Sequence, residues 1–355
     1  MVFGEKVKDS KGDKQLNKTI SFDDVLLIPQ YSDIESRSQV NLEARLSDEI
    51  SLSLPVISSP MDTVTEEEMA ITMHEHGGLG VVHRYNTIQQ QSKIVYEAYS
   101  KGAKNIAVAI GMSGDYMERA IASVDVGANI ICVDVAHGHH AVMETCLKSL
   151  KDKFGDDIHL MAGNVATLEA FECLSSWGAD SIRVGIGGGS ICSTRIVTGH
   201  GVPTLQSVLE CAKTQTNTKI IADGGLKTTG DIVKAIAAGA DFVMLGSMLA
   251  GTSETPGSVF TSADGKKYKV YRGMASHAAQ TNWRGKSSTP EGVSTTVPYR
   301  GQVDLILKDL LGGIRSGLSY SGCRSISEFQ SKAQFIQQSS AGQSESSTHI
   351  LWRNK

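Results

Sequence analysis

The chain has 355 residues, of which 40% are hydrophobic, and its formal net charge is −4. A slightly acidic chain without a basic cluster argues against partners such as nucleic acid or an anionic membrane surface. The six cysteines are scattered without a CxxC pair, and no apolar run is long enough for a membrane span or signal peptide, so we expect a soluble cytoplasmic protein without disulfides or a zinc site.

The ends of the chain differ in composition from the middle. Residues 1–18 are charged and are predicted to form a flexible N-terminal segment. Residues 19–335 are predicted to form one catalytic domain, because α/β barrels commonly reach this length as a single unit. Residues 336–355 are rich in Ser and Gln and are predicted to be a mobile tail unless a neighbouring subunit orders them.

From Leu54 onward, short apolar runs alternate with amphipathic stretches of helical length. Apolar runs without alternation are typical of parallel strands buried on both faces. There are eight of them, which favours a closed α/β TIM (β/α)8 barrel over an open doubly wound sheet. The predicted strands are 55–59, 79–83, 105–110, 129–134, 158–162, 181–184, 219–223 and 241–245, with helices that include 66–76, 230–238, 301–313 and 326–335.

Polar residues follow most of these runs, among them Asp62, His83, Asp134, Asn164 and Asp223. In a barrel of parallel strands they would all lie on the C-terminal face, where such folds assemble their active sites. One polar residue at a strand end can simply cap the next helix. A ring of such residues at most of the strand ends favours an active site.

Residues 184–201 contain six glycines, four hydroxyl side chains and one cysteine, Cys192. Glycines allow a backbone to adopt positive φ and to approach a ligand closely, and a cysteine in such a loop can act as a nucleophile. The alternative is a flexible surface loop with an incidental buried cysteine. Its place directly after a predicted strand favours the catalytic interpretation.

Gly224-Gly225 and Gly246-Ser247 follow the seventh and eighth predicted strands. At these positions barrels present backbone N–H groups to a phosphate. The Asp223 carboxylate would repel a phosphate, so we expect it to accept hydrogen bonds from sugar hydroxyls. A phosphorylated ribose is the ligand that this pattern indicates.

Seven motifs, in order, resemble the IMP dehydrogenase/GMP reductase family over about residues 18 to 350. They are SFDDVLLIP at 21–29, SPMDTV at 59–64, GNV at 163–165, VGIGGGSICSTR at 184–195, ADGG at 222–225, GS at 246–247 and YRGM at 271–274. One position departs from the family, since Gly188 stands where proline is common. We expect this glycine to make the cysteine loop more flexible.

The resemblance implies that the Cys192 thiolate attacks C2 of a purine nucleotide and that a hydride moves between the adduct and a nicotinamide. A GMP reductase releases ammonia from GMP and then uses NADPH to give IMP. An IMP dehydrogenase passes a hydride from IMP to NAD and hydrolyses the adduct to XMP.

The resemblance also assigns residues to roles. The catalytic residues would be Cys192, Thr194 and Glu291. The backbone carbonyls of Gly187, Gly189 and Cys192 would bind a monovalent cation, expected to be potassium. Substrate contacts would come from Asn164, Ser190, Asp223, Gly224, Gly225, Gly246, Ser247, Tyr271, Gly273 and Met274, and cofactor contacts from Asp134, Ala136, His137 and Gly138.

The flap at about 274–292 favours the reductase. Dehydrogenases of the family carry an Arg-Tyr pair there that activates water, whereas this flap has Trp283 followed by Arg284. Reductases use the equivalents of Thr194 and Glu291 to deliver a proton to the leaving ammonia. The short 84–104 segment lacks the regulatory modules that many dehydrogenases insert, which is a weaker indication.

Other segments, at 59–66, 290–294 and 341–346, are closer to dehydrogenases. The sequence therefore predicts a GMP reductase, with IMP dehydrogenase as the alternative and a non-catalytic purine-nucleotide-binding barrel as a third hypothesis. Trp283 could stack on the cofactor adenine or cover the site as a lid. The resemblance further implies a homotetramer.

Overall fold

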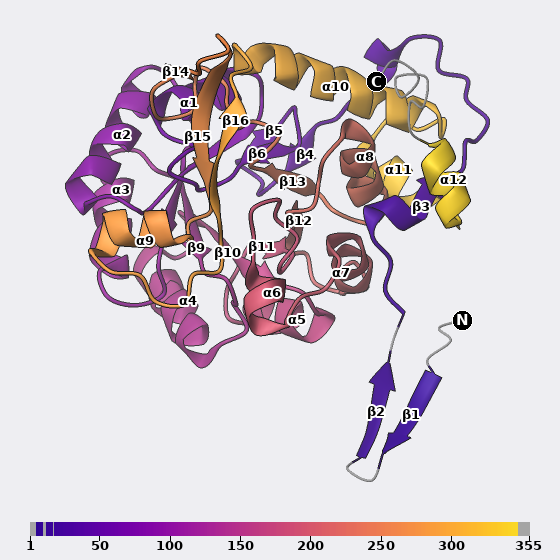
Figure 1. Ribbon diagram of the computed structural model, residues 1–355, viewed down its shortest axis with the longest axis horizontal. Coiled ribbons are helices and arrows are strands. Elements are labelled where there is room, and N and C mark those ends of the chain that lie inside the picture. The colour runs from indigo at the N-terminus through magenta and orange to yellow at the C-terminus, as the bar shows by residue number, and fades with distance from the viewer. Residues whose placement is uncertain (1–4, 10–11, 17, 347–355) are drawn as a thin grey trace.

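The computed structural model describes residues 5–9, 12–16 and 18–346. Its centre is a closed barrel of eight parallel strands in the order β10-β11-β12-β13-β6-β7-β8-β9, which confirms the predicted TIM barrel (Figure 1). The strands are β6 (Val56–Ser58), β7 (Leu79–Val82), β8 (Ala107–Ile110), β9 (Ile130–Asp134), β10 (His159–Val165), β11 (Ser181–Val184), β12 (Lys219–Asp223) and β13 (Phe242–Leu245).

Helices surround the barrel; all but the last connect successive strands, and the last follows the final strand of the barrel (Figure 1). They are α1 (Glu67–Glu75), α2 (Ile88–Ser100), α3 (Tyr116–Val124), α4 (Ala141–Phe154), α5 (Leu168–Ser176), α6 (Thr194–Thr198), α7 (Thr204–Cys211), α8 (Thr229–Ala237) and α10 (Val303–Ser319). Several begin at residues whose side chains satisfy the free N–H groups of the first turn. Thr87 and Thr228 each form a capping box at the start of α2 and α8.

Side chains at the N-terminal ends of the strands help to fix the barrel register. The Asp180 carboxylate, just before β11, accepts the Leu160 N–H at 2.7 Å. Asp241, just before β13, accepts the Ile220 N–H at 2.8 Å. Each bond joins the start of one strand to its neighbour, and a one-residue slip would break it.

A short hairpin of β4 (Ala44–Arg45) and β5 (Ser51–Leu52) closes the N-terminal end of the barrel. Its side chains Leu46, Ile50 and Leu52 belong to the same buried cluster as Ile57, Phe242 and the other side chains of the barrel interior. With this end filled by apolar side chains, the opposite end is left for ligands.

A second sheet follows the last barrel strand. It consists of β14 (Phe260–Thr261), β15 (Lys267–Arg272) and β16 (Ser294–Pro298), paired antiparallel. The connection from β15 to β16 contains the predicted flap and its helix α9 (His277–Arg284). Figure 1 shows this orange segment reaching α9 beside α3.

The two ends of the chain contain more regular structure than the sequence indicated. Strands β1 (Glu5–Asp9) and β2 (Gly12–Leu16) form a hairpin that extends away from the barrel in Figure 1. The helix predicted at 326–335 ends earlier, as α11 (Ile326–Lys332), because Phe335 pairs with Leu27 of β3 (Val25–Leu27) in strand β17 (Phe335–Gln337).

The predicted tail begins with this strand and continues into α12 (Ser340–Glu345). Its last part, residues 347–355, lies outside the described residues, as do positions 1–4, 10–11 and 17 of the predicted N-terminal segment. Short 3-10 turns at Phe22–Asp24 and Arg37–Gln39 complete the described elements. In the part of the chain that the structure describes, no helix has the length and apolar character needed to cross a membrane.

Candidate active site

A cavity of about 390 Å³ opens at the C-terminal end of the barrel. It lies among the loops that follow β6, β7, β9, β10, β11 and β12, and the flap supplies its remaining wall. The predicted site residues that line it are Asp134, Ala136, Asn164, Gly187, Gly189, Cys192, Thr194, Asp223, Gly224, Tyr271, Gly273, Met274 and Glu291. The other predicted site residues, His137, Gly138, Ser190, Gly225, Gly246 and Ser247, are not part of this lining.

The three predicted catalytic residues form a continuous hydrogen-bonded chain. The Cys192 thiol donates to the Thr194 hydroxyl, with a distance of 3.2 Å between Sγ and Oγ1. The Thr194 hydroxyl in turn donates to the Glu291 carboxylate, with 2.8 Å between Oγ1 and Oε2. A proton on the sulfur therefore has a path to a carboxylate that lies 99 positions further along the chain.

Backbone hydrogen bonds hold these three side chains in place. The Ser193 N–H donates to the Glu291 carbonyl at 2.9 Å, and the Val293 N–H donates to the Ile191 carbonyl at 3.0 Å. A β-bridge pairs Cys192 with Gly292. The cysteine loop and the C-terminal end of the flap are thus fixed in one register, which explains how residues distant in sequence meet.

The environment of Cys192 differs from that of the buried cysteines. Burial raises the pKa of the Cys132, Cys146 and Cys211 thiols to about 12, which keeps them protonated. Cys192 is partly exposed and lines the cavity. Of these four cysteines, Cys192 is the one that both faces the cavity and has a hydrogen-bond acceptor for its proton.

Hydroxyl groups gather around Tyr271, which lines the cavity. Burial raises the pKa of this phenol, and interactions with the Ser190 and Ser247 side chains partly oppose that rise. A Cβ atom at Gly246 would lie 3.1 Å from the Tyr271 hydroxyl, so the lack of a side chain there allows close approach. Converging hydroxyls and backbone beside a glycine turn suit an anionic group such as phosphate.

The sequence analysis did not single out Ser59 as a site residue. Its side chain is 6% exposed and lines the cavity, and its Oγ has no hydrogen-bond partner among the described residues. A Cβ at Gly246 would meet this Oγ at 3.0 Å, so Ser59 belongs to the same hydroxyl group. A buried polar atom without a partner is costly unless a ligand satisfies it. The only sequence signal was its place in the 59–64 motif.

Arg183 is a second residue that the sequence analysis missed. It lies inside β11 and is 7% exposed, and its guanidinium bridges Asp134 and Asp223. Burial opposes the charge, but the two carboxylates outweigh it and raise the pKa of Arg183 well above its ordinary value. Arg183 therefore connects a predicted cofactor residue at the end of β9 with a predicted ribose ligand at the end of β12.

Asn164 and Arg84 extend this polar network. The Asn164 amide donates to Asp223 Oδ2 and to the Gly185 carbonyl, both at 2.8 Å. Its Oδ1 is buried without a partner among the described residues, so it remains able to accept a hydrogen bond. Arg84, which follows β7, donates to the Asp134 carbonyl at 3.1 Å.

The other predicted cofactor residues form the turn after β9. Ala136 and His137 are exposed, whereas Gly138 is buried and donates its N–H to the Asn164 carbonyl at 2.8 Å. A Cβ at Gly138 would lie 3.2 Å from that carbonyl oxygen, so the turn packs closely on β10. An exposed turn beside the cavity leaves room for a second ligand, and its residues fit the role of a cofactor edge.

The predicted cation ligands all belong to one loop. The Gly189 carbonyl already accepts the Cys192 N–H at 3.1 Å. Because a carbonyl oxygen has two lone pairs, it can still bind a cation. The donor set of hard carbonyl oxygens from Gly187, Gly189 and Cys192 fits potassium chemically.

Gly188, where the family commonly has proline, is tightly packed. A Cβ there would lie 2.6 Å from Thr204 Oγ1, and Gly224 lies on the same side. Thr204 is 4% exposed and cannot easily move aside. The missing side chain thus lets the cysteine loop lie against the start of α7.

The Arg-Gly-Met segment is held to the loop after β6. The Arg272 guanidinium donates to both oxygens of Asp62, with 3.0 Å between Nε and Oδ2. The Arg272 N–H donates to the Thr63 hydroxyl at 3.2 Å. These contacts place Met274 at the cavity wall, where its sulfur accepts the Asp62 N–H.

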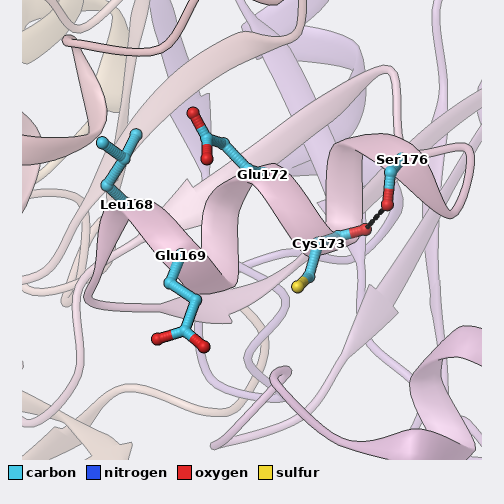
Figure 2. A pocket seen from close by; sticks show the side chains of 5 residues that line it. All are labelled: Leu168, Glu169, Glu172, Cys173 and Ser176. Carbon is cyan, nitrogen blue, oxygen red and sulfur yellow. Dashed lines mark hydrogen bonds between the residues drawn. The ribbon is translucent and has the colours of Figure 1, made fainter.

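A second hollow lies beside α5, and all the residues that line it come from that helix (Figure 2). Glu169 and Glu172 point in different directions, and the Ser176 hydroxyl donates to the Cys173 carbonyl of its own helix at 2.8 Å. No polar groups from different elements converge there. The cavity that contains Cys192 is therefore the candidate active site.

Comparison with known proteins shows the family of the chain. A family model described as the IMP dehydrogenase / GMP reductase domain matches residues 19–349. Inosine-5'-monophosphate dehydrogenase from Nitrosopumilus maritimus is 34% identical, with 94% of this chain and 99% of the relative covered. GMP reductase from Leishmania major is 33% identical, with 95% and 98% covered.

Among solved structures, GMP reductase from Trypanosoma brucei in complex with guanosine 5'-monophosphate matches with a TM-score of 0.89 and 32% sequence identity. The match covers 94% of this chain and 98% of that one. Relatives with either name are similar to this chain to nearly the same degree, so the choice between the two reactions depends on the site.

Proposed function

Because the chain belongs to the IMP dehydrogenase/GMP reductase family of oxidoreductases, we propose that it is a GMP reductase that converts GMP to IMP and ammonia with NADPH. The observation that carries this proposal is the hydrogen-bonded chain from Cys192 through Thr194 to Glu291. A dehydrogenase must activate water, whereas a reductase must protonate leaving ammonia. A thiol joined to a carboxylate through a hydroxyl is suited to the second task.

The first step forms a bond between the Cys192 sulfur and purine C2 and breaks the bond from C2 to the 2-amino nitrogen. The thiol proton passes to the Thr194 hydroxyl, whose own proton passes to Glu291. Glu291 then returns a proton to the departing nitrogen through the same hydroxyl. The thiol and GMP thus give a thioimidate adduct and ammonia, with no change in the oxidation state of either partner.

We assign the nucleotide's phosphate to the hydroxyls of Ser59, Ser190, Ser247 and Tyr271, with Gly224, Gly225 and Gly246 allowing close approach of the backbone. The orphaned Ser59 Oγ supports this assignment. Asp223 would accept the ribose hydroxyls, and Asn164, Gly273 and Met274 would contact the base. Arg183 holds Asp223 in place for this role.

A bound NADPH would supply the hydride that releases the base from the sulfur as IMP. The residues proposed to hold it are Asp134, Ala136, His137 and Gly138. Arg183 and Arg84 orient the Asp134 carboxylate, so it presents a fixed acceptor to the nicotinamide side of the cofactor. Potassium, bound by the carbonyls of Gly187, Gly189 and Cys192, would order the cysteine loop.

IMP dehydrogenase is the second candidate, and the curated relatives favour it to a similar degree. The enzyme of that name from Cryptosporidium parvum is 37% identical to this chain. Against it stands the flap, in which Trp283 occupies the segment where the dehydrogenases carry their Arg-Tyr pair.

Two assays separate these reactions. The enzyme is incubated with GMP and NADPH and, separately, with IMP and NAD, in potassium buffer, while the absorbance of reduced nicotinamide is followed. We expect consumption in the first assay and no signal in the second. The reverse result would establish the dehydrogenase, and silence in both with retained GMP binding would support a non-catalytic binding barrel.

Variants of the hydrogen-bonded chain test the mechanism. Cys192→Ala should abolish turnover while GMP still binds, because the phosphate and ribose contacts remain. Glu291→Gln should lower kcat by about 100-fold, a typical contribution of one acid–base group, with little change in KM for GMP. Exposed Glu118→Gln on α3 is the matched control. Full activity of Cys192→Ala would exclude the covalent route.

We also propose a homotetramer, since the family resemblance implies one. Sedimentation velocity of the full chain tests it directly, and a monomer at micromolar concentration would exclude it.

A further inference from the structure

Helix α9 of the flap carries an aromatic side chain that packs onto the barrel. The Trp283 ring lies with its centroid 6.0 Å from that of Tyr85, which follows β7. On α3, the Arg119 guanidinium carbon lies 5.9 Å from the Trp283 ring centroid. Both distances are those of attractive ring–ring and cation–π contacts. Trp283 thus joins the flap to two different parts of the barrel wall.

The arginine in this contact is held rigidly. Arg119 is 2% exposed. It donates to Asn86 Oδ1 and Gln91 Oε1 at 3.2 Å, to the Asn86 carbonyl at 3.0 Å and to Asp115 Oδ2 at 2.8 Å. Because these bonds exist without Trp283, the guanidinium is a fixed platform onto which the flap docks.

The same helix supplies part of the cavity wall. Gln280 lies three positions before Trp283, so the two side chains share one face of α9. Gln280 is 7% exposed and lines the cavity, and it ties the flap together by donating to the Ala275 carbonyl at 3.0 Å and accepting the Ser288 N–H at 2.9 Å. Docking of Trp283 therefore fixes Gln280 in the wall of the cavity that Cys192 and Glu291 also line.

We propose that Trp283 is a positioning residue that holds α9 closed over the cavity and so keeps water from the purine adduct on Cys192. This inference rests on the proposed GMP reductase function. It assigns to Trp283 the control over which product the thioimidate on Cys192 gives. In the thioimidate, C2 can accept either a hydride, which gives IMP, or water. Attack by water forms a bond from oxygen to C2, breaks the bond from C2 to sulfur and returns a proton to the thiol, which gives XMP.

Trp283→Ala tests the proposal through the ratio of the two products. Loss of one aromatic pair and one cation–π contact should reduce closure of the flap by about tenfold. We expect the XMP share of product from GMP and NADPH to rise by about the same factor, while GMP affinity is unchanged. Trp283→Phe keeps a ring and should give a smaller rise. Exposed Asn282→Ala on the same helix is the matched control and should leave the ratio as in the parent enzyme.

Hydrogen exchange of the α9 amides supplies a readout that does not depend on the reaction. We expect faster exchange at residues 277–284 in Trp283→Ala than in Asn282→Ala, with the barrel strands unchanged. An unchanged product ratio in folded Trp283→Ala, or unchanged exchange, overturns the inference. If the parent enzyme makes no IMP from GMP, it is the proposed function that has failed, and the exchange measurement alone then decides whether Trp283 holds the flap.

Discussion

Replacing Arg183 with methionine removes the guanidinium that joins Asp134 and Asp223 at the mouth of the barrel. Methionine has a similar length, so the change removes charge and hydrogen bonds with little change in volume. Arg183 donates to Asp134 and, at 2.8 and 3.1 Å, to Asp223. Both carboxylates are largely buried, with side chains 17% and 16% exposed. Each would be left with a like charge nearby.

Breaking a buried ion pair by removing one partner typically costs 3–5 kcal/mol, because the other charge stays buried. Asp134 keeps a weak contact with Arg84 at 3.7 Å, and Asp223 keeps the Asn164 amide at 2.8 Å. We therefore expect a loss of about 3 kcal/mol in the free energy of unfolding, at the lower end of that range. Arg183→Lys keeps the charge but not the planar fork that reaches both carboxylates, so about half of the loss should remain.

Urea unfolding followed by circular dichroism at pH 7 measures this loss. Surface Arg324→Met, which breaks an exposed pair with Asp33, is the control and should have little effect. A loss below about 1 kcal/mol, or equal losses in the methionine and lysine variants, would refute this account of Arg183.

Three further substitutions probe other parts of the structure. Burial lowers the pKa of His159 to about 4 from 6.5. The neutral imidazole therefore contributes at most about 3 kcal/mol to the free energy of unfolding, which is present above pH 6.5 and is lost as the pH falls through 4. His159→Asn should flatten the pH dependence of urea unfolding, and an unchanged slope would contradict this. Gly188→Ala places a Cβ 2.6 Å from Thr204 Oγ1 and should lower kcat about tenfold, with recovery when Thr204→Ala is added; no recovery would locate the clash elsewhere. Lys269→Met leaves the Thr255 carbonyl without its donor and should lower the free energy of unfolding by about 2 kcal/mol, whereas exposed Lys267→Met on the same strand should not; equal effects would rule out the buried bond as the cause.

The barrel could be predicted because its eight strands are buried on both faces and therefore stand out as apolar runs. The polar residues after most of these runs were equally visible, and the family motifs identified Cys192, Thr194 and Glu291 as a group. The structure then brings these three side chains into contact. Their roles stay predictions, which the assays above would test.

Other features could not be predicted, because they depend on contacts between distant segments. Arg183 looked like one polar residue in an apolar strand, since its partners Asp134 and Asp223 come from two other strands. The hydrophobic pattern predicted a helix up to residue 335, but α11 ends at Lys332 because Phe335 pairs with Leu27. Contact of Trp283 with Arg119 likewise joins segments more than 150 residues apart, and no spacing rule indicates it.

The bridge between Cys192 and Gly292 has a consequence for how this site can change over generations. The bonds that align the nucleophile with its acid run between peptide groups, from Ser193 to Glu291 and from Val293 to Ile191. Sequence drift at Ile191, Ser193 or Val293 therefore leaves the alignment intact, provided that no proline removes a donor. Insertions or deletions in either strand of this bridge would be far less tolerated than replacements.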